Sequence, residues 1–198
     1  GRTDLHSGDS LDQMGLAGSH HAYGSGWANL GNTPLNMYKH FCHEGGITSP
    51  LIVHWPAGLQ NLQAWVHDPA HLMDIMPTVL DAADANYPDS YHGQTVTPAE
   101  GTSLLPAITG QPIPERPLAF EHQAARGLRL GKWKITWGKR QPTEPAWELY
   151  DLDSDRFEQR NLAEQHPDVL ARLAGEWELW ARRVGAEPFQ EPTDAASN

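Results

Sequence analysis

At 198 residues the chain is long enough to bury a hydrophobic core, and this length is typical of one domain or of one and a half. Its 16 Pro and 18 Gly indicate many turns and argue against a helical bundle, so we expect an irregular α/β or α+β chain. The formal charge of −11, with only 14 Lys and Arg, argues against a nucleic-acid-binding surface, because such surfaces need clustered basic residues.

The cysteine count and the hydropathy pattern exclude further classes of protein. The single cysteine, Cys42, excludes an internal disulfide framework and any zinc site made of several cysteines, and we expect it to be a small packing residue. No apolar run approaches the roughly 20 residues that span a bilayer, so the sequence predicts no membrane segment. The chain begins at Gly1 without an initiator methionine or a signal-peptide pattern, and we interpret it as part of a longer protein.

The first part of the chain predicts a loop followed by a buried strand. Residues 1–36 are rich in Gly, Ser, Asn and His without periodicity, which is typical of a long loop. The apolar run at 50–55 is closed by Pro56-Ala57-Gly58 and resembles a strand that is covered on both faces in a parallel sheet. We therefore expect a strand at about 51–55 in a central α/β sheet.

Apolar residues at helical spacing predict an amphipathic helix at about 74–84. Pro77 fits a straight helix only in its first turn. Either Asp74 caps a helix with Pro77 in that turn, or a longer helix that starts at Asp68 is kinked at Pro77. The first alternative is preferred. Residues 84–117 contain repeated Pro, Gly, Asn and Asp, which predict a linker and a domain boundary near residue 115.

Beyond this boundary the apolar period changes to two, as in strands. Alternation around the two-residue turn Gly131-Lys132 predicts a β-hairpin at about 126–137, with glycine first as a II′ turn prefers. The run at 147–150 predicts a further strand. An amphipathic pattern that opens at Pro167 and ends at Gly185 predicts a long helix at about 167–184. These elements indicate a small antiparallel sheet covered by one helix.

Several charged groups have ordinary structural interpretations. The basic stretch at 126–140 alternates with Leu and Trp, which favours a solvated sheet face over a binding patch. The 11 histidines include His20-His21 and the pair His40 and His43, but no third ligand has a suitable spacing. We therefore expect loop and surface histidines and no metal site made by this chain alone.

One lysine stands out by its position. Lys39 lies five residues before the turn Glu44-Gly45-Gly46, which leads directly into the predicted strand. Ligands of α/β sheets gather at strand ends and adjoining loops, and a cation there suits an oxyanion. The alternative is a solvated lysine without a role. No Gly-rich phosphate loop, His-Glu-x-x-His pair or nucleophile elbow accompanies it.

Residues 27–56 resemble a stretch of the type I sulfatases, of the form N-x-P-x-x-x-Y-K-x-x-x-x-E-G-G-[IV]-x-x-P-x-[IL]-x-x-W-P, at nearly every fixed position. Further segments match the same family in the same order: 74–80 (D-[IL]-x-P-T-[LV]-L), 101–106 (G-x-S-L-L-P), 129–134 (R-x-G-x-W-K), 147–151 (W-E-L-Y-D) and 161–163 (N-L-A). The resemblance covers about residues 20–185, nearly the whole chain. It implies an α/β fold in which residues 1–115 are the C-terminal end of an alkaline phosphatase-like sheet domain and residues 116–198 are a subdomain of antiparallel sheet and long helix.

The resemblance also implies a reaction, of which this chain carries only a part. In the family a hydrated formylglycine, made from an upstream Cys or Ser, attacks the sulfate sulfur beside a bound Ca²⁺. The chain has no Cys-x-Pro-x-Arg or Ser-x-Pro-x-Arg site and lacks the aspartates that would bind calcium. Lys39 matches the catalytic lysine that contacts the sulfate ester. His122, in the pair Glu121-His122, is a weaker candidate for substrate binding, and structural hydrogen bonding is the preferred interpretation.

The implied function is hydrolysis of an aryl sulfate or a sulfated carbohydrate to alcohol and sulfate, in a periplasmic or secreted enzyme whose N-terminal part is missing from this chain. Two alternatives stay open. One alternative is hydrolysis of phosphate or phosphonate esters. These are charged tetrahedral esters too, and a metal ion assists their hydrolysis in the same superfamily. A truncated gene product would instead be a non-catalytic remnant that at most binds anions.

Overall fold

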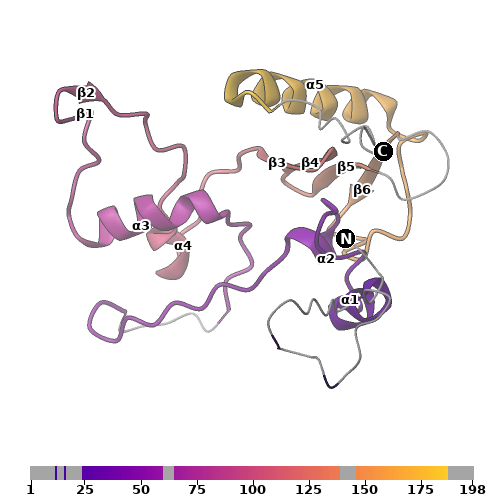
Figure 1. Cartoon of the computed structure of the whole chain (residues 1–198), viewed down its shortest axis with the longest axis horizontal. Helices are drawn as coiled ribbons and strands as arrows, with labels where there is room; N and C mark the ends of the chain where they lie inside the picture. The colour runs from indigo at the N-terminus through magenta and orange to yellow at the C-terminus, as the bar shows by residue number, and fades with distance from the viewer. Residues whose placement is uncertain (1–11, 13–15, 17–23, 60–64, 139–145, 187–198) are drawn as a thin grey trace. The chain divides into compact units, whose positions relative to one another are not determined.

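The computed structural model describes residues 12, 16, 24–59, 65–138 and 146–186 (Figure 1). The chain divides into two compact units. We call residues 1–50 together with 116–198 the sheet unit, and residues 51–115 the middle unit. Within the described ranges, no helix is long and apolar enough to cross a membrane.

The sheet unit is a four-stranded antiparallel sheet with a long helix on one face (Figure 1). The strand order is β3-β4-β5-β6, which follows the chain. Its elements are α1 (Ser25–Asn32), α2 (Glu44–Ile47), β3 (Leu118–His122), β4 (Ala125–Leu130), β5 (Trp133–Trp137), β6 (Trp147–Asp151) and α5 (Pro167–Val184). The predicted hairpin, the strand at 147–150 and the long helix are therefore confirmed, whereas β3 was not predicted.

The turn and the helix end follow from local chemistry. Gly131, the first residue of the β4–β5 turn, has a φ of 57°, which a II′ turn requires at this position. Gly185 ends α5 in the left-handed conformation, with a φ of 69°. Pro167 opens the same helix, where its missing N–H costs nothing.

The core lies between the sheet and α5. Leu128, Ile135 and Leu149 are fully buried, and they meet Leu173 and Trp177 of the helix. Leu128 and Ile135 are register partners in β4 and β5, and Ile135 pairs with Leu149 of β6. One face of three neighbouring strands therefore supplies this half of the core.

The opposite face of the sheet is covered as well. Cys42 lies against Gly127, His43 contacts Thr136, and Glu44 contacts Lys134. Side chains alternate across a strand, so Lys134 and Thr136 point away from α5, and both are fully buried. The prediction of a solvated basic face is therefore wrong for Lys134. Its charge is matched by carboxylates from distant segments, which no alternation within the strand reveals. Arg126 also has a partner, since its guanidinium lies over the Trp137 and Trp177 rings.

The middle unit contains η2 (Leu72–Asp74), α3 (Ile75–Ala82), β1 (Ser90–Tyr91), β2 (Gln94–Thr95) and α4 (Leu105–Ile108). Pro77 lies in the first turn of α3, as preferred from the sequence. Asp74 does not cap α3 with its side chain. Its buried carboxylate instead accepts hydrogen bonds from the backbone N–H of His71, at 2.7 Å, and of Thr102, at 2.9 Å, and so ties the loop before α4 to the start of the helix.

Two predictions for the first part of the chain are wrong. Residues 51–55 form no strand and are exposed, with Ile52 88% accessible. A parallel strand needs at least one neighbouring strand to complete its backbone hydrogen bonds, and the described residues supply none for this segment. The loop predicted for 1–36 contains α1, whose residues Trp27 and Leu30 share one face at i and i+3. The rest of that prediction falls mostly on residues outside the described ranges.

Candidate functional site

Lys39 lies in an exposed turn between α1 and α2. The backbone on either side of it is strained, because Met37 has a φ of 62° and His40 a φ of 82°. Residues other than glycine rarely adopt a positive φ, because this conformation costs roughly 1–3 kcal/mol for each residue. It persists only where the surrounding structure holds the residue in place. The turn that presents Lys39 is therefore fixed by its contacts and not by local preference.

The glycine pair that follows Lys39 explains part of this fixation. A Cβ atom at Gly45 would collide with the carbonyl oxygens of Asn36 and Met37, and one at Gly46 would collide with that of Phe41. The backbone N–H of Gly45 donates to Asn36 O at 2.7 Å. Residues 36–41 thus wrap directly over the first turn of α2, which only residues without a side chain permit.

His122 and the residue after Lys39 are brought together although 82 positions separate them in sequence. His40 Nδ1 and His122 Nε2 lie 2.9 Å apart, and the two rings stack with centroids 5.0 Å apart. One imidazole donates and the other accepts, so at least one of the two must be neutral. The sequence-predicted candidates Lys39 and His122 therefore lie on adjoining segments, because His122 contacts His40, the residue that follows Lys39.

This pairing predicts a pH-dependent contact. Partial burial and the positive charges of His122 and Lys39 lower the pKa of His40 below 6.5. Because the folded state then binds fewer protons than the unfolded state, the contact contributes stability above about pH 6.5 that is lost as the pH falls through the lowered pKa. In an NMR titration the His40 ring should titrate below 6.5, and His122→Gln should raise its midpoint. The control His92→Gln, at an exposed histidine of the middle unit, should leave it unchanged; a midpoint that ignores His122 would refute the pairing.

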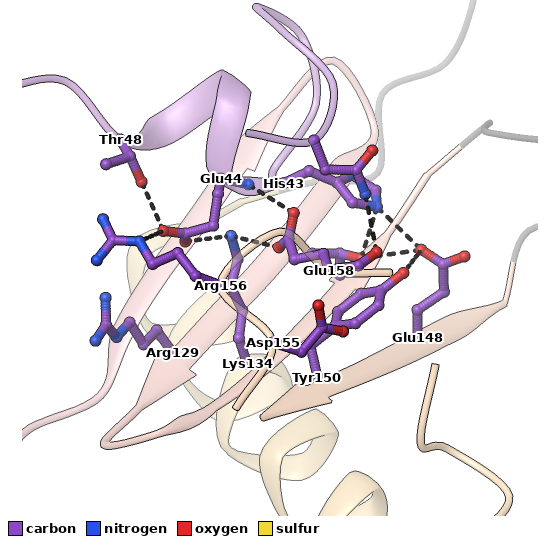
Figure 2. A network of polar contacts seen from close by, with 12 residues as sticks. His43, Glu44, Thr48, Arg129, Lys134, Glu148, Tyr150, Asp155, Arg156 and Glu158 are labelled. Carbon is purple, nitrogen blue, oxygen red and sulfur yellow. Dashed lines mark hydrogen bonds and ion pairs between the residues drawn. The ribbon is translucent and has the colours of Figure 1, made fainter. Parts of the chain in front are cut away.

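A buried ion cluster joins Lys134 to Glu44 and Glu158 (Figure 2). Lys134 Nζ lies 2.7 Å from Glu44 Oε1 and 2.8 Å from Glu158 Oε1, and each of the three side chains is at most 1% exposed. Burial raises the pKa of Glu44, but the charge and hydrogen bond of Lys134 outweigh it, so that the pKa is lowered. Glu44 is therefore a carboxylate at neutral pH, and the cluster is ionic.

A second polar group extends the cluster across β5 and β6 (Figure 2). His43 Nε2 lies 3.0 Å from Glu148 Oε2, which also accepts a hydrogen bond from the Tyr150 hydroxyl at 2.9 Å.

Cys42 is buried against Gly127, where an added Cβ would lie 2.7 Å from that of the cysteine. Burial raises the pKa of the Cys42 thiol to about 12, so it is a packing residue, as expected, and not a nucleophile.

The described residues contain no group of three His, Cys, Asp or Glu that could hold a metal ion. They do not fit a calcium site, whose ligands are mainly carboxylates. The sequence suggested Lys39 and His122 as site residues, and both assignments stay predictions. It did not reveal Lys134, Glu44 and Glu158 as a unit. A lysine on the inward side of a strand was the only available signal for that unit.

Known proteins with similar sequences are sulfatases. The chain is 30% identical over 181 residues to an uncharacterized sulfatase of Schizosaccharomyces pombe, a match that covers 89% of the chain and 32% of the relative. It is 30% identical over 143 residues to arylsulfatase K of Danio rerio (69% and 26% covered) and 30% identical over 128 residues to choline-sulfatase of Rhizobium meliloti (61% and 22% covered). The chain thus spans about a third or less of these relatives.

A solved structure shares the fold. The crystal structure of Ps i-CgsB matches with a TM-score of 0.58 at 22% identity, over 82% of this chain and 34% of that one. The same protein was solved in complex with k-i-k-neocarrahexaose. No family model matches the chain.

Proposed function

We propose that this chain, which is homologous to the C-terminal part of sulfatases of the alkaline phosphatase-like fold, is part of an enzyme that hydrolyses sulfate esters to alcohol and sulfate. The observation that carries the proposal is the Lys39 turn: an exposed lysine on a backbone held in a strained conformation, five residues before Glu44, where α2 begins. A lysine whose backbone is held in this way is better suited to one defined anionic position than a lysine on a flexible loop.

Lys39 would act by electrostatics. As the S–O bond of the ester breaks, negative charge develops on the bridging oxygen and persists on the sulfate oxygens. An ammonium aimed at these oxygens stabilises the transition state more than the ground state, which is what lowers the barrier. His122, held by its contact with His40, would lie beside the same substrate and donate a hydrogen bond to it.

The remaining parts of the reaction would come from outside this chain. We infer that the preceding part of the enzyme supplies a formylglycine nucleophile and Ca²⁺, which would polarise the sulfate oxygens. In this arrangement residues 1–115 complete the α/β catalytic domain and residues 116–198 form the C-terminal subdomain. The relatives' names range from choline-sulfatase to N-acetylgalactosamine-6-O-sulfatase, so the proposed substrate class is sulfate esters in general.

The experiment is a comparison of two esters on the complete enzyme. Its kcat/KM for an aryl sulfate should exceed that for the matched aryl phosphate by at least about 100-fold, a difference of about 2.7 kcal/mol in transition-state stabilisation. The 198-residue chain alone should hydrolyse neither ester with calcium present, because Lys39 supplies no nucleophile. A preference for the phosphate would favour the phosphate or phosphonate hydrolase, and no hydrolysis of either ester would favour the non-catalytic remnant.

A further inference from the structure

The turn that presents Lys39 depends on one distant residue, Glu158. The Glu158 carboxylate oxygen Oε2 accepts the backbone N–H of Glu44 at 2.8 Å, and the Glu158 carbonyl accepts the side-chain amide of Asn36 at 3.3 Å. Glu158 therefore forms hydrogen bonds with both ends of the segment 36–44, which contains Lys39. Glu158 itself has a φ of 54°, so its own backbone is held in a conformation that it would not choose alone.

Lys134 supplies the positive charge that allows Glu44 and Glu158 to lie together as buried carboxylates. Two carboxylates, Glu44 and Glu158, meet where both are almost entirely buried. Without a cation between them they could not both stay charged, because a buried charge without a partner costs several kcal/mol. Lys134 approaches both carboxylates to within 2.8 Å from β5 (Figure 2). A second cation, Arg156, lies farther from Glu44, at 3.7 Å, and its side chain is half exposed.

Lys134 is rigidly placed by its strand. It lies between Trp133 and Ile135, both of which pack in the core under α5, and it pairs in register with Tyr150 of β6. The backbone of Lys134 is therefore held by strands that pack in the core, and its ammonium by the two buried carboxylates. From there the chain of contacts leads through Glu158 and Glu44 to the strained turn.

We propose that Lys134 is a positioning residue for Lys39: its buried ion pairs with Glu44 and Glu158 lock the segment 36–48 onto the antiparallel sheet and so fix where the Lys39 ammonium points. The effect of Lys134 on catalysis rests on the proposed function. The mechanical part, the locking of residues 36–48 onto the sheet, does not depend on that function.

The mechanical part is tested by amide hydrogen exchange on the complete enzyme with Lys134→Met. Exchange in residues 36–48 should become at least about tenfold faster, while the amides of α5 keep their protection, because only the local opening of this segment becomes easier. Lys132→Met is the matched control. Lys132 is two residues away, 45% exposed and paired at 2.7 Å with Asp151, and its loss should leave residues 36–48 unchanged. Unchanged exchange in Lys134→Met would overturn the proposal.

The kinetic part is tested by a double-mutant cycle with Lys39→Ala. Lys134→Met alone should lower kcat/KM about 10- to 100-fold, since a misplaced catalytic group can cost that much. In the Lys39→Ala background the same change should cost less than about twofold, because a residue that acts only through Lys39 has nothing left to position. Effects that multiply instead would show that Lys134 does not act through Lys39.

A milder variant covers the case in which Lys134→Met does not fold. Glu158→Gln keeps the shape of the side chain but removes the charge that pairs with Lys134. It should give faster exchange in residues 36–48 and the same dependence on Lys39. If the unmodified enzyme hydrolyses no sulfate ester, the proposed function fails, while the exchange measurement still decides whether the cluster locks the segment.

Discussion

We expect Lys39→Ala in the complete enzyme to lower the turnover of an aryl sulfate by about 100-fold or more, the usual effect of removing one group that stabilises an oxyanion. The melting temperature should change little, because the Lys39 side chain is exposed and its turn is held by other residues. Steady-state kinetics and thermal unfolding of the same preparation measure the two effects.

Two further variants separate position from charge. Lys39→Arg should not restore turnover, since a planar guanidinium does not occupy the place of a compact ammonium. Lys132→Ala removes another exposed lysine and should leave turnover near that of the unmodified enzyme. If Lys39→Ala stays within about twofold, a loss below about 0.5 kcal/mol in barrier terms, Lys39 is only a solvated charge.

Trp177→Ala should destabilise the sheet unit by about 3–5 kcal/mol, as expected for removing a large buried side chain. Trp177 is 5% exposed and belongs to the core between α5 and the sheet. Its indole N–H donates to Phe120 O at 3.0 Å, and its ring lies 4.9 Å from the Arg126 guanidinium carbon. The change therefore creates a cavity and also breaks a polar tie to β3. Urea unfolding followed by circular dichroism measures the loss.

Leu179→Ala is the matched control on the same helix. Leu179 is 63% exposed, and exposed substitutions usually change stability by less than about 0.5 kcal/mol. Equal losses for Trp177→Ala and Leu179→Ala would mean that α5 does not pack on the sheet through the face described here.

The C-terminal elements could be predicted because their signals are local. Period-two alternation around Gly131 and a helical pattern between Pro167 and Gly185 specify a hairpin and a helix whatever else the chain does. The strand predicted at 51–55 shows the limit of this reasoning. Its apolar run is compatible with a strand, but a strand forms only where neighbours complete its hydrogen bonds, and the described residues supply none.

The limit is similar for the candidate site. Lys39 could be proposed as a candidate from its spacing to Glu44-Gly45-Gly46, and its role stays a prediction. Lys134 could not, because whether a lysine in an alternating strand faces water or a buried carboxylate depends on Glu44 and Glu158, which lie 90 and 24 positions away. The contact of His40 with His122 depends equally on β3, an element that the sequence did not reveal.

The most direct measurement is a crystal structure of the complete enzyme with sulfate bound. We expect the Lys39 Nζ to lie about 3 Å from a sulfate oxygen, at the distance of a charge-assisted hydrogen bond, with His122 on the same side of the anion. A sulfate held entirely by other groups, with Lys39 directed into solvent, would contradict the assignment of this chain's catalytic contribution.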